Sequence, residues 1–189
     1  MPAKESIRQM LAPGRRHDAG RVWEVVELID SRRAKLAQLV ECLWDHDPAI
    51  ANRAADALER VMRDRPAVAQ RWKDELLGLI AEAAEKKLRW NLALLIPRLR
   101  LTVPECRRVA NVLHSYLEDP SSIVKTAALH GMAHLTRQDP ESLSAVLDLL
   151  RVAARSGTPA MRARSRILLK GIECSRQKGQ NRSSIHMFD

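Results

Sequence analysis

The chain has 189 residues, a formal net charge of +9 and 46% hydrophobic residues, a content that excludes a wholly disordered protein. The length favours one elongated domain, and the low glycine count of 7 favours helix over sheet. The three cysteines lack CxxC spacing, which favours free thiols over a disulfide framework. The longest apolar run, residues 92–96, is too short to span a membrane, and residues 1–16 lack a signal-peptide core. We therefore expect a cytoplasmic protein without a membrane partner.

The first part of the chain contains one clear helical segment. Residues 20–31 place their valines and an isoleucine on one face, which predicts an amphipathic helix that caps the following domain. A helix over residues 5–11 would be marginal by itself. We therefore expect residues 1–18 to form a partly flexible N-terminal arm.

Four segments then repeat one pattern at intervals of 38, 36 and 37 residues. The anchor residues of the four copies are Ile50, Leu88, Val124 and Met161. Apolar or small residues follow each anchor at offsets of 4, 8 and 11, which fall on one stripe of an α-helix. A helical stripe that recurs at this period is typical of stacked helical-repeat proteins.

Each repeat is predicted to contain two helices. The first helices are expected at residues 33–45, 67–82, 104–118 and 140–155, and the second helices at 48–63, 86–100, 121–137 and 159–174. Several of these helices begin at a proline that follows Asp or Thr, a combination typical of helix N-termini. The repeat domain is expected over 19–172, and the polar residues 173–189 are predicted to form a flexible basic tail.

Short motifs at the turns relate these repeats to a known family. The motifs are Asp47-Pro48 with Ala54, Ala57 and Leu58, Asp119-Pro120 with Val124, Lys125, Ala128 and Leu135, and the pairs Leu88-Arg89 and Met161-Arg162. In these residues the chain resembles the HEAT-repeat family, although Ala51 replaces a basic residue and Glu85-Lys86 stand where Asp-Pro is expected. The resemblance implies an all-α, right-handed α-solenoid of about four HEAT-like helix pairs with an N-terminal capping helix. Members of the family serve as scaffolds, adaptors and nucleic-acid clamps, and a minority are enzymes.

The face of the second helices opposite the core stripe is the first candidate site, and the resemblance implies that it lines a concave surface. Its candidate partner-binding residues are Trp90, Leu94, Leu101, His130 and Arg137. An apolar patch on a polar face predicts a surface that binds a protein partner. The alternative interpretation is that Pro97 kinks the second repeat's helix and buries its apolar residues on more sides.

The basic C-terminal end is the second candidate site. Residues 151–189 carry 9 Lys and Arg against 2 acidic residues, whereas residues 36–150 carry 15 against 16. The candidate phosphate contacts are Arg162, Arg164, Arg166 and Lys170, which predict nucleic-acid binding as an alternative function. The other interpretation is a solvated cap on the last repeat, and the neutral middle repeats favour it.

Evidence for catalysis is weak. His130 and His134 have the spacing of a helical metal site, but Gly131 stands where a metalloprotease requires Glu, and no third ligand is indicated. Asp56 and Trp90 lie on adjacent second helices, which keeps a HEAT-like DNA glycosylase as a remote alternative. We predict a non-enzymatic protein-binding scaffold with no metal or cofactor, and a nucleic-acid-binding protein as the alternative.

Overall fold

The structure is a computed structural model that describes residues 5–12, 21–31 and 35–185, and all regular secondary structure in these ranges is helical. The all-α prediction is therefore confirmed for the described residues. The α-helices are α1 (Ile7–Leu11), α2 (Val22–Ser31), α3 (Leu36–Glu41), α4 (Pro48–Asp64), α5 (Lys73–Glu82), α6 (Lys86–Leu95), α7 (Val103–Ser115), α8 (Ser122–Leu135), α9 (Leu143–Ser156) and α10 (Pro159–Ile185). None of these helices combines the length and apolar character that a membrane span requires.

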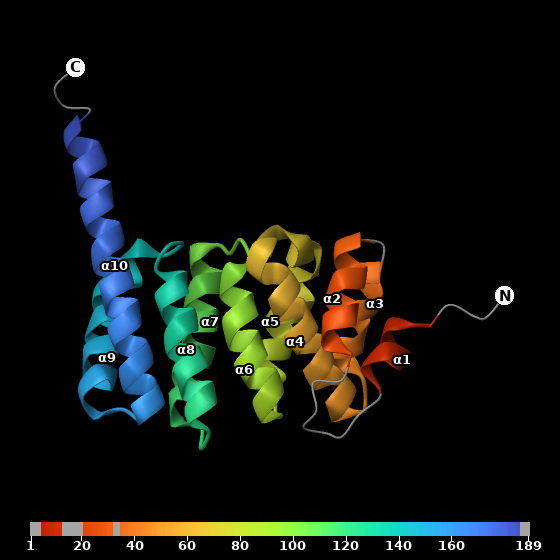
Figure 1. Cartoon of the computed structure of the whole chain (residues 1–189). Helices are drawn as coiled ribbons and strands as arrows, with labels where there is room; N and C mark the ends of the chain where they lie inside the picture. Colours follow the sequence, from red (N-terminus) through yellow and green to blue (C-terminus); the bar gives the residue numbers. More distant parts are fainter. Residues whose placement is uncertain (1–4, 13–20, 32–34, 186–189) are drawn as a thin grey trace.

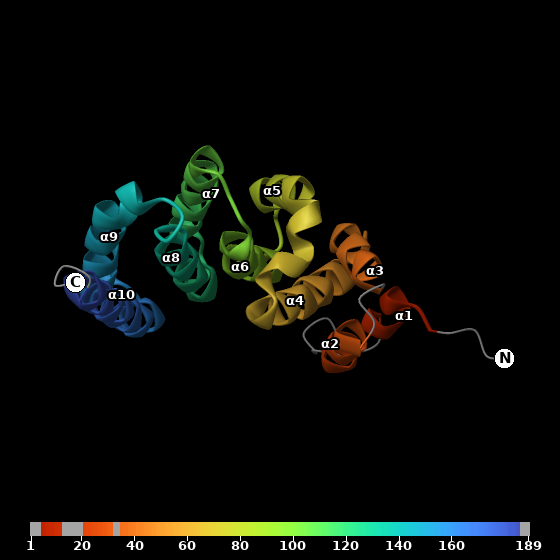
Figure 2. The ribbon, with the colours of Figure 1, turned by 90° about the horizontal axis from the view of Figure 1, so that it is seen from above.

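The helices stand side by side in a row with two layers (Figure 1). Viewed from above, α3, α5, α7 and α9 form one layer, and α2, α4, α6, α8 and α10 form the other (Figure 2). Consecutive members of the second layer contact each other along the whole row, from α2 to α10. The row bends into an arch whose inner side is formed by this second layer, so we call it the inner layer.

The repeated apolar stripe forms the core between the layers. The four residues at offset 4 from the anchors, Ala54, Leu92, Ala128 and Ser165, are all 0% exposed. The other stripe residues of the last repeat are less well covered, since Met161, Leu169 and Ile172 are only half-buried. The reason is that no described helix lies beyond α10 to cover its outer side.

Several helix ends differ from the sequence prediction. Helix α5, expected from residue 67, begins at Lys73 after a 3-10 segment over Pro66–Trp72, and α3 ends at Glu41, before a 3-10 turn over Cys42–Trp44. Helix α6 was expected to reach residue 100, but it ends at Leu95 and is followed by a 3-10 turn over Ile96–Arg98. Pro97 explains the early end because it lacks the N–H that would bond to the Ala93 carbonyl. Helix α10 instead continues to Ile185, so residues 173–185, predicted to be a flexible tail, have helical backbone. Extending a packed helix adds a hydrogen bond for each residue fixed and avoids the cost of nucleation.

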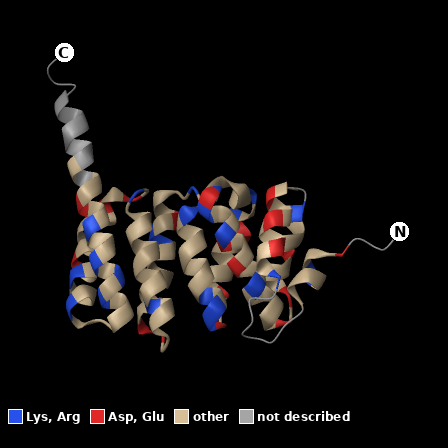
Figure 3. Cartoon of the chain, in the orientation of Figure 1, with Lys and Arg blue, Asp and Glu red and all other residues tan. Residues whose placement is uncertain are grey.

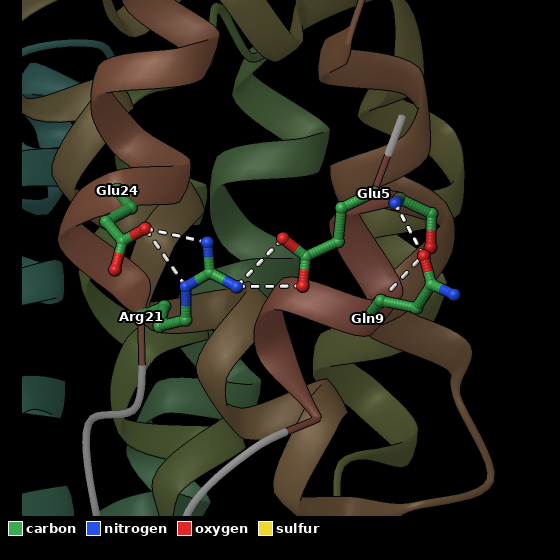
Figure 4. Close-up of polar contacts among 5 residues, drawn as sticks. Glu5, Gln9, Arg21 and Glu24 are labelled. Carbon is green, nitrogen blue, oxygen red and sulfur yellow. Dashed lines mark hydrogen bonds and ion pairs between the residues drawn. The ribbon is translucent and has the colours of Figure 1, made fainter. Parts of the chain in front are cut away.

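The N-terminal segment is packed rather than arm-like over its described part. In α1, Ile7 and Leu11 are fully buried, and the remaining residues of the predicted 1–18 arm lie outside the described ranges. Arg21 connects α1 to α2 because its guanidinium contacts Glu5 and Glu24 at 2.8 Å each (Figure 4). Tertiary packing and these ion pairs stabilise a helix that is too short to persist alone.

The side-chain amide of Gln138, just after α8, forms hydrogen bonds with the loop that follows α6. The Gln138 Nε2 atom donates to the carbonyls of Pro97 and Leu99 at 3.0 Å each. Its Oε1 atom accepts from the Leu101 N–H at 2.9 Å. These three bonds satisfy backbone groups that the shortened helix leaves free, and they fix the position of α8 relative to α6.

Candidate binding groove

A groove of about 490 Å³ lies on the inner layer and crosses α4, α6, α8 and α10. Each helix contributes residues that are four positions apart and therefore share one helix face. These pairs are Glu59 and Arg63, Trp90 and Leu94, Thr126 and His130, and Ala160 and Arg164. The groove thus joins residues from all four repeats, and we refer to it below as the inner groove.

A buried carboxylate forms the base of the inner groove. The side chain of Glu59 is 4% exposed, and its Oε1 atom lies 2.8 Å from Nη2 of Arg98. The other oxygen, Oε2, contacts Nη2 of Arg63 at 2.6 Å. Arg98 also donates to the Glu59 backbone carbonyl at 3.1 Å, so both ends of Glu59 are tied to the second repeat. This network occupies both carboxylate oxygens and holds α4 against the turn after α6.

The middle of the inner groove is apolar and open to solvent. Trp90 is 36% exposed and Ile123 is 48% exposed, while Leu94 is half-buried against the core. Large apolar side chains that converge in one solvent-filled hollow are typical of interaction sites. Trp90 is therefore a groove residue rather than part of the core.

His130 is neutral at pH 7 in this environment. Burial is the main cause that lowers its pKa to about 4, and the nearby Arg164, His134 and Arg98 act in the same direction. Burial also lowers the pKa of His134, although its Nδ1 atom is 2.9 Å from the Pro97 carbonyl. Neither imidazole adds positive charge to the groove at neutral pH.

His130 should make folding stability sensitive to mild acid. The pKa of His130 is lower in the folded state than the unfolded value of 6.5, so protonation of this residue favours unfolding. The free energy of unfolding is therefore unaffected by His130 protonation above about pH 6.5 and falls as the pH decreases towards 4. The full loss is on the order of 2–3 kcal/mol. We expect urea unfolding of His130→Gln to change less between pH 7 and pH 4 than that of the wild type. His114→Gln, at an exposed histidine, is the matched control, and equal pH slopes for all three proteins would contradict the assignment.

Two cations at the ends of the inner groove retain free hydrogen-bonding capacity. Arg164 on α10 forms no ion pair with the carboxylates that the structure describes. Arg63 on α4 uses one nitrogen for Glu59, and its side chain is 60% exposed. Three arginines and one glutamate line the groove, so its net charge is +2 with neutral His130. The groove therefore combines an apolar centre with positive ends.

The structure brings three of the predicted partner-binding residues together and leaves two outside. Trp90, Leu94 and His130 line the inner groove, whereas Leu101 and Arg137 do not. Leu101 lies in the loop bound by Gln138, and Arg137 follows the end of α8. The early end of α6 at Leu95 removes Leu101 from the helical face on which the sequence places it.

The predicted phosphate contacts do not form one surface. Only Arg164 reaches the inner groove. Arg162 donates to the Gly157 carbonyl at 2.8 Å and so connects the first turn of α10 to the loop before it. Arg166 and Lys170 are exposed and follow Arg162 at intervals of four residues, so these three lie on a different face of α10 from Arg164. Basic and acidic residues are distributed along the row of described helices (Figure 3).

Asp56 and Trp90, considered together for catalysis, do not line the same groove. The Asp56 carboxylate is bound by Nε of Arg60 at 2.8 Å and is not part of the groove around Trp90. Within the described ranges, no three His, Cys, Asp or Glu residues are grouped as metal ligands. Glu59 is the acidic residue that lines the groove, and arginines already hold both of its carboxylate oxygens.

A larger hollow of about 730 Å³ lies between α5 and α7 in the other layer. Its charged lining is limited to Asp74 and Arg108, and its remaining lining is apolar, small or amide. Two of the exposed large apolar side chains, Trp90 and Ile123, line the inner groove, and none of those that the structure describes lines the hollow between α5 and α7. We therefore regard the inner groove as the candidate site.

Comparison of the chain with protein-family models, curated proteins and solved structures gives no significant match. The site is thus defined by its own geometry. Sequence analysis missed Ile123, since it precedes the anchor Val124 and is on none of the face offsets considered. Glu59, which the two arginines cover, is likewise absent from the predicted partner-binding residues.

Proposed function

We propose that this chain is a right-handed, HEAT-like α-solenoid of about four helix pairs that acts as a non-enzymatic scaffold for a protein partner. The regular alternation of helices between two layers and the buried offset-4 column support this architecture. Helix α2 covers the side of α4 that would otherwise lack a neighbour, as a capping helix does. The fold supplies an extended surface on which the partner docks.

The observation that carries the proposal is the exposed apolar centre of the inner groove. Trp90 and Ile123 lie on neighbouring helices, and the ion-pair network of Glu59 lines the same groove. Large apolar anchors in a preformed hollow contribute most of the binding energy at protein interfaces. A protein segment that inserts an apolar side chain between them fits this arrangement.

Nucleic-acid binding is the second candidate, favoured by one arrangement in the inner groove. Arg63 and Arg164 flank Trp90, as phosphate-binding cations flank a base-stacking residue. Arg164, Arg63, which already pairs with Glu59, and one aromatic side chain provide few contacts for a polynucleotide, which normally engages several phosphates. We therefore place this candidate after protein binding.

The proposal is tested by matched substitutions at exposed apolar residues. Ile123→Ser and Trp90→Ala change the inner groove, whereas Val152→Ser changes a 51% exposed residue on α9 in the other layer. We expect both groove variants to lose at least tenfold in capture of partners from nuclease-treated lysate. Val152→Ser should capture the same partners as the wild type.

Melting temperatures distinguish lost binding from lost folding. Trp90 is partly exposed, so its truncation should cost less than the roughly 3–5 kcal/mol typical of a buried tryptophan. Equal capture by Val152→Ser and Ile123→Ser would place the binding surface elsewhere. Loss of all partners after nuclease treatment would favour the nucleic-acid candidate.

A further inference from the structure

We propose that the inner groove recognises an extended acidic peptide segment, in which carboxylates flank a large apolar side chain. The inference rests on the proposed protein-binding function and specifies the chemistry of the partner. Trp90 and Ile123 would receive the apolar side chain, and Arg164 and Arg63 would receive the carboxylates.

Charge complementarity is the first argument for an acidic segment. Arg98 is only 15% exposed and is committed to Glu59, so it is part of the base of the groove. Arg63 and Arg164 keep donors that face solvent, and Glu59 balances only one of the three guanidinium charges. A guanidinium binds a carboxylate through charge-assisted hydrogen bonds, often two in parallel. A basic segment would be repelled, and a neutral one would leave these donors without a charged acceptor.

The dimensions of the groove are the second argument. Packed helices lie about 8–10 Å apart, so the three steps from α4 to α10 span roughly 24–30 Å. An extended chain advances about 3.3 Å per residue, and a segment of about eight residues therefore crosses all four helices. Its central residue would lie over α6 and α8, where Trp90 and Ile123 are exposed. The ends of the segment would reach Arg63 and Arg164.

Other occupants fit the groove less well. The chain's own residues 175–189 carry three Lys and Arg against one Asp, so the positive groove would repel them. A polynucleotide would place its backbone phosphates across the apolar centre, where Trp90, Leu94 and Ile123 offer no charge. An acidic peptide with a central apolar residue matches both parts of the lining.

The experiment selects ligands from a random library of displayed 12-residue peptides on the full-length protein. Binding of the enriched peptides is then measured for the wild type, Arg164→Gln and Ile123→Ser. Arg166→Gln is the control, because Arg166 is exposed on the same helix but outside the groove. We expect enriched peptides to carry Asp or Glu on both sides of an apolar residue. Arg164→Gln, and replacement of the peptide carboxylates by amides, should each weaken binding about tenfold.

A nuclear magnetic resonance titration of His130 gives an independent readout. Burial is the main cause that lowers the pKa of His130 to about 4 in the free protein, and the nearby Arg164 is the next largest. A bound carboxylate near Arg164 would counteract this effect and raise the pKa of His130. The amide version of the same peptide should not raise it.

The outcomes separate the inference from the proposed function. Peptides that require Ile123 but bind equally well as amides, with equal affinity for Arg164→Gln and Arg166→Gln, would overturn acidic recognition and retain protein binding. The absence of any peptide that depends on Ile123 would overturn both. Binding of a single-stranded 20-nucleotide DNA, weakened by Arg164→Gln, in place of peptides would assign the groove to nucleic acid.

Discussion

Gly131→Ala should lower the free energy of unfolding by about 2–3 kcal/mol, a large effect for one added methyl group. A Cβ atom at Gly131 would lie 2.5 Å from the Ala93 carbonyl oxygen and 2.8 Å from Cδ1 of Leu113. The carbonyl belongs to the backbone of α6, so relief of the clash requires α8 to move away from α6. Urea unfolding with an unchanged m-value measures the effect.

Gly78→Ala is the matched control because Gly78 is also in a helix, α5, but its added Cβ would meet no atom within 4 Å beyond its neighbours in the chain and its own helix backbone. Alanine is favoured over glycine in helices, so this variant should gain about 0.5–1 kcal/mol. The two substitutions are thus expected to have opposite signs. Equal effects would contradict the close approach of α6 and α8.

Glu59→Ala should destabilise the protein by about 3 kcal/mol, because it leaves Arg98 largely buried without its carboxylate partner. Asp56→Ala on the same helix is the matched control. The Asp56–Arg60 pair is more exposed, at 29% and 26%, and such surface pairs contribute about 0.3–0.5 kcal/mol. Chemical denaturation of both variants at pH 7 measures the difference.

A paired replacement identifies the cause of that loss. In Glu59→Leu combined with Arg98→Met, neither charge remains, so much of the stability lost in Glu59→Ala should return. No recovery in the double variant would show that the cost arises from packing rather than from the unpaired arginine. A cost for Glu59→Ala no larger than that for Asp56→Ala would contradict the buried network itself.

The periodic apolar positions made most of the helical arrangement predictable from sequence. The offset-4 column is buried in all four repeats because one stripe of each second helix must pack against its neighbours. The positions of Trp90, Leu94 and His130 on one face follow from the same periodicity. This periodicity relates residues that are only a few positions apart, so a short stretch of sequence is enough to reveal it.

The parts that could not be predicted depend on contacts between repeats. Leu101 leaves the predicted face because Pro97 ends α6 early and Gln138 binds the following loop. Glu59 is buried because Arg98, 39 residues later, covers it. The angle between helices determines such pairs, and a single sequence does not specify that angle.

The split of the basic residues on α10 has a different cause. Arg162, Arg164 and Arg166 alternate along the sequence, and this spacing places neighbours in the set about 200° apart on a helix. Charge counting therefore predicted a basic end, whereas helical geometry assigns only Arg164 to the groove. The Glu residue that metalloproteases need has no space at Gly131, because even a Cβ atom would contact Ala93.

Site-specific photo-crosslinking tests the central claim, binding of a protein segment in the inner groove, most directly. A photoreactive amino acid replaces Ile123 in the groove or Val152 on α9, which are similarly exposed at 48% and 51%. After irradiation in native lysate, mass spectrometry identifies the crosslinked material. We predict peptide adducts at position 123 that an excess of the selected acidic peptide abolishes, with no matching adducts at position 152. Equal adducts at both positions, or nucleotide adducts at position 123, would contradict the account.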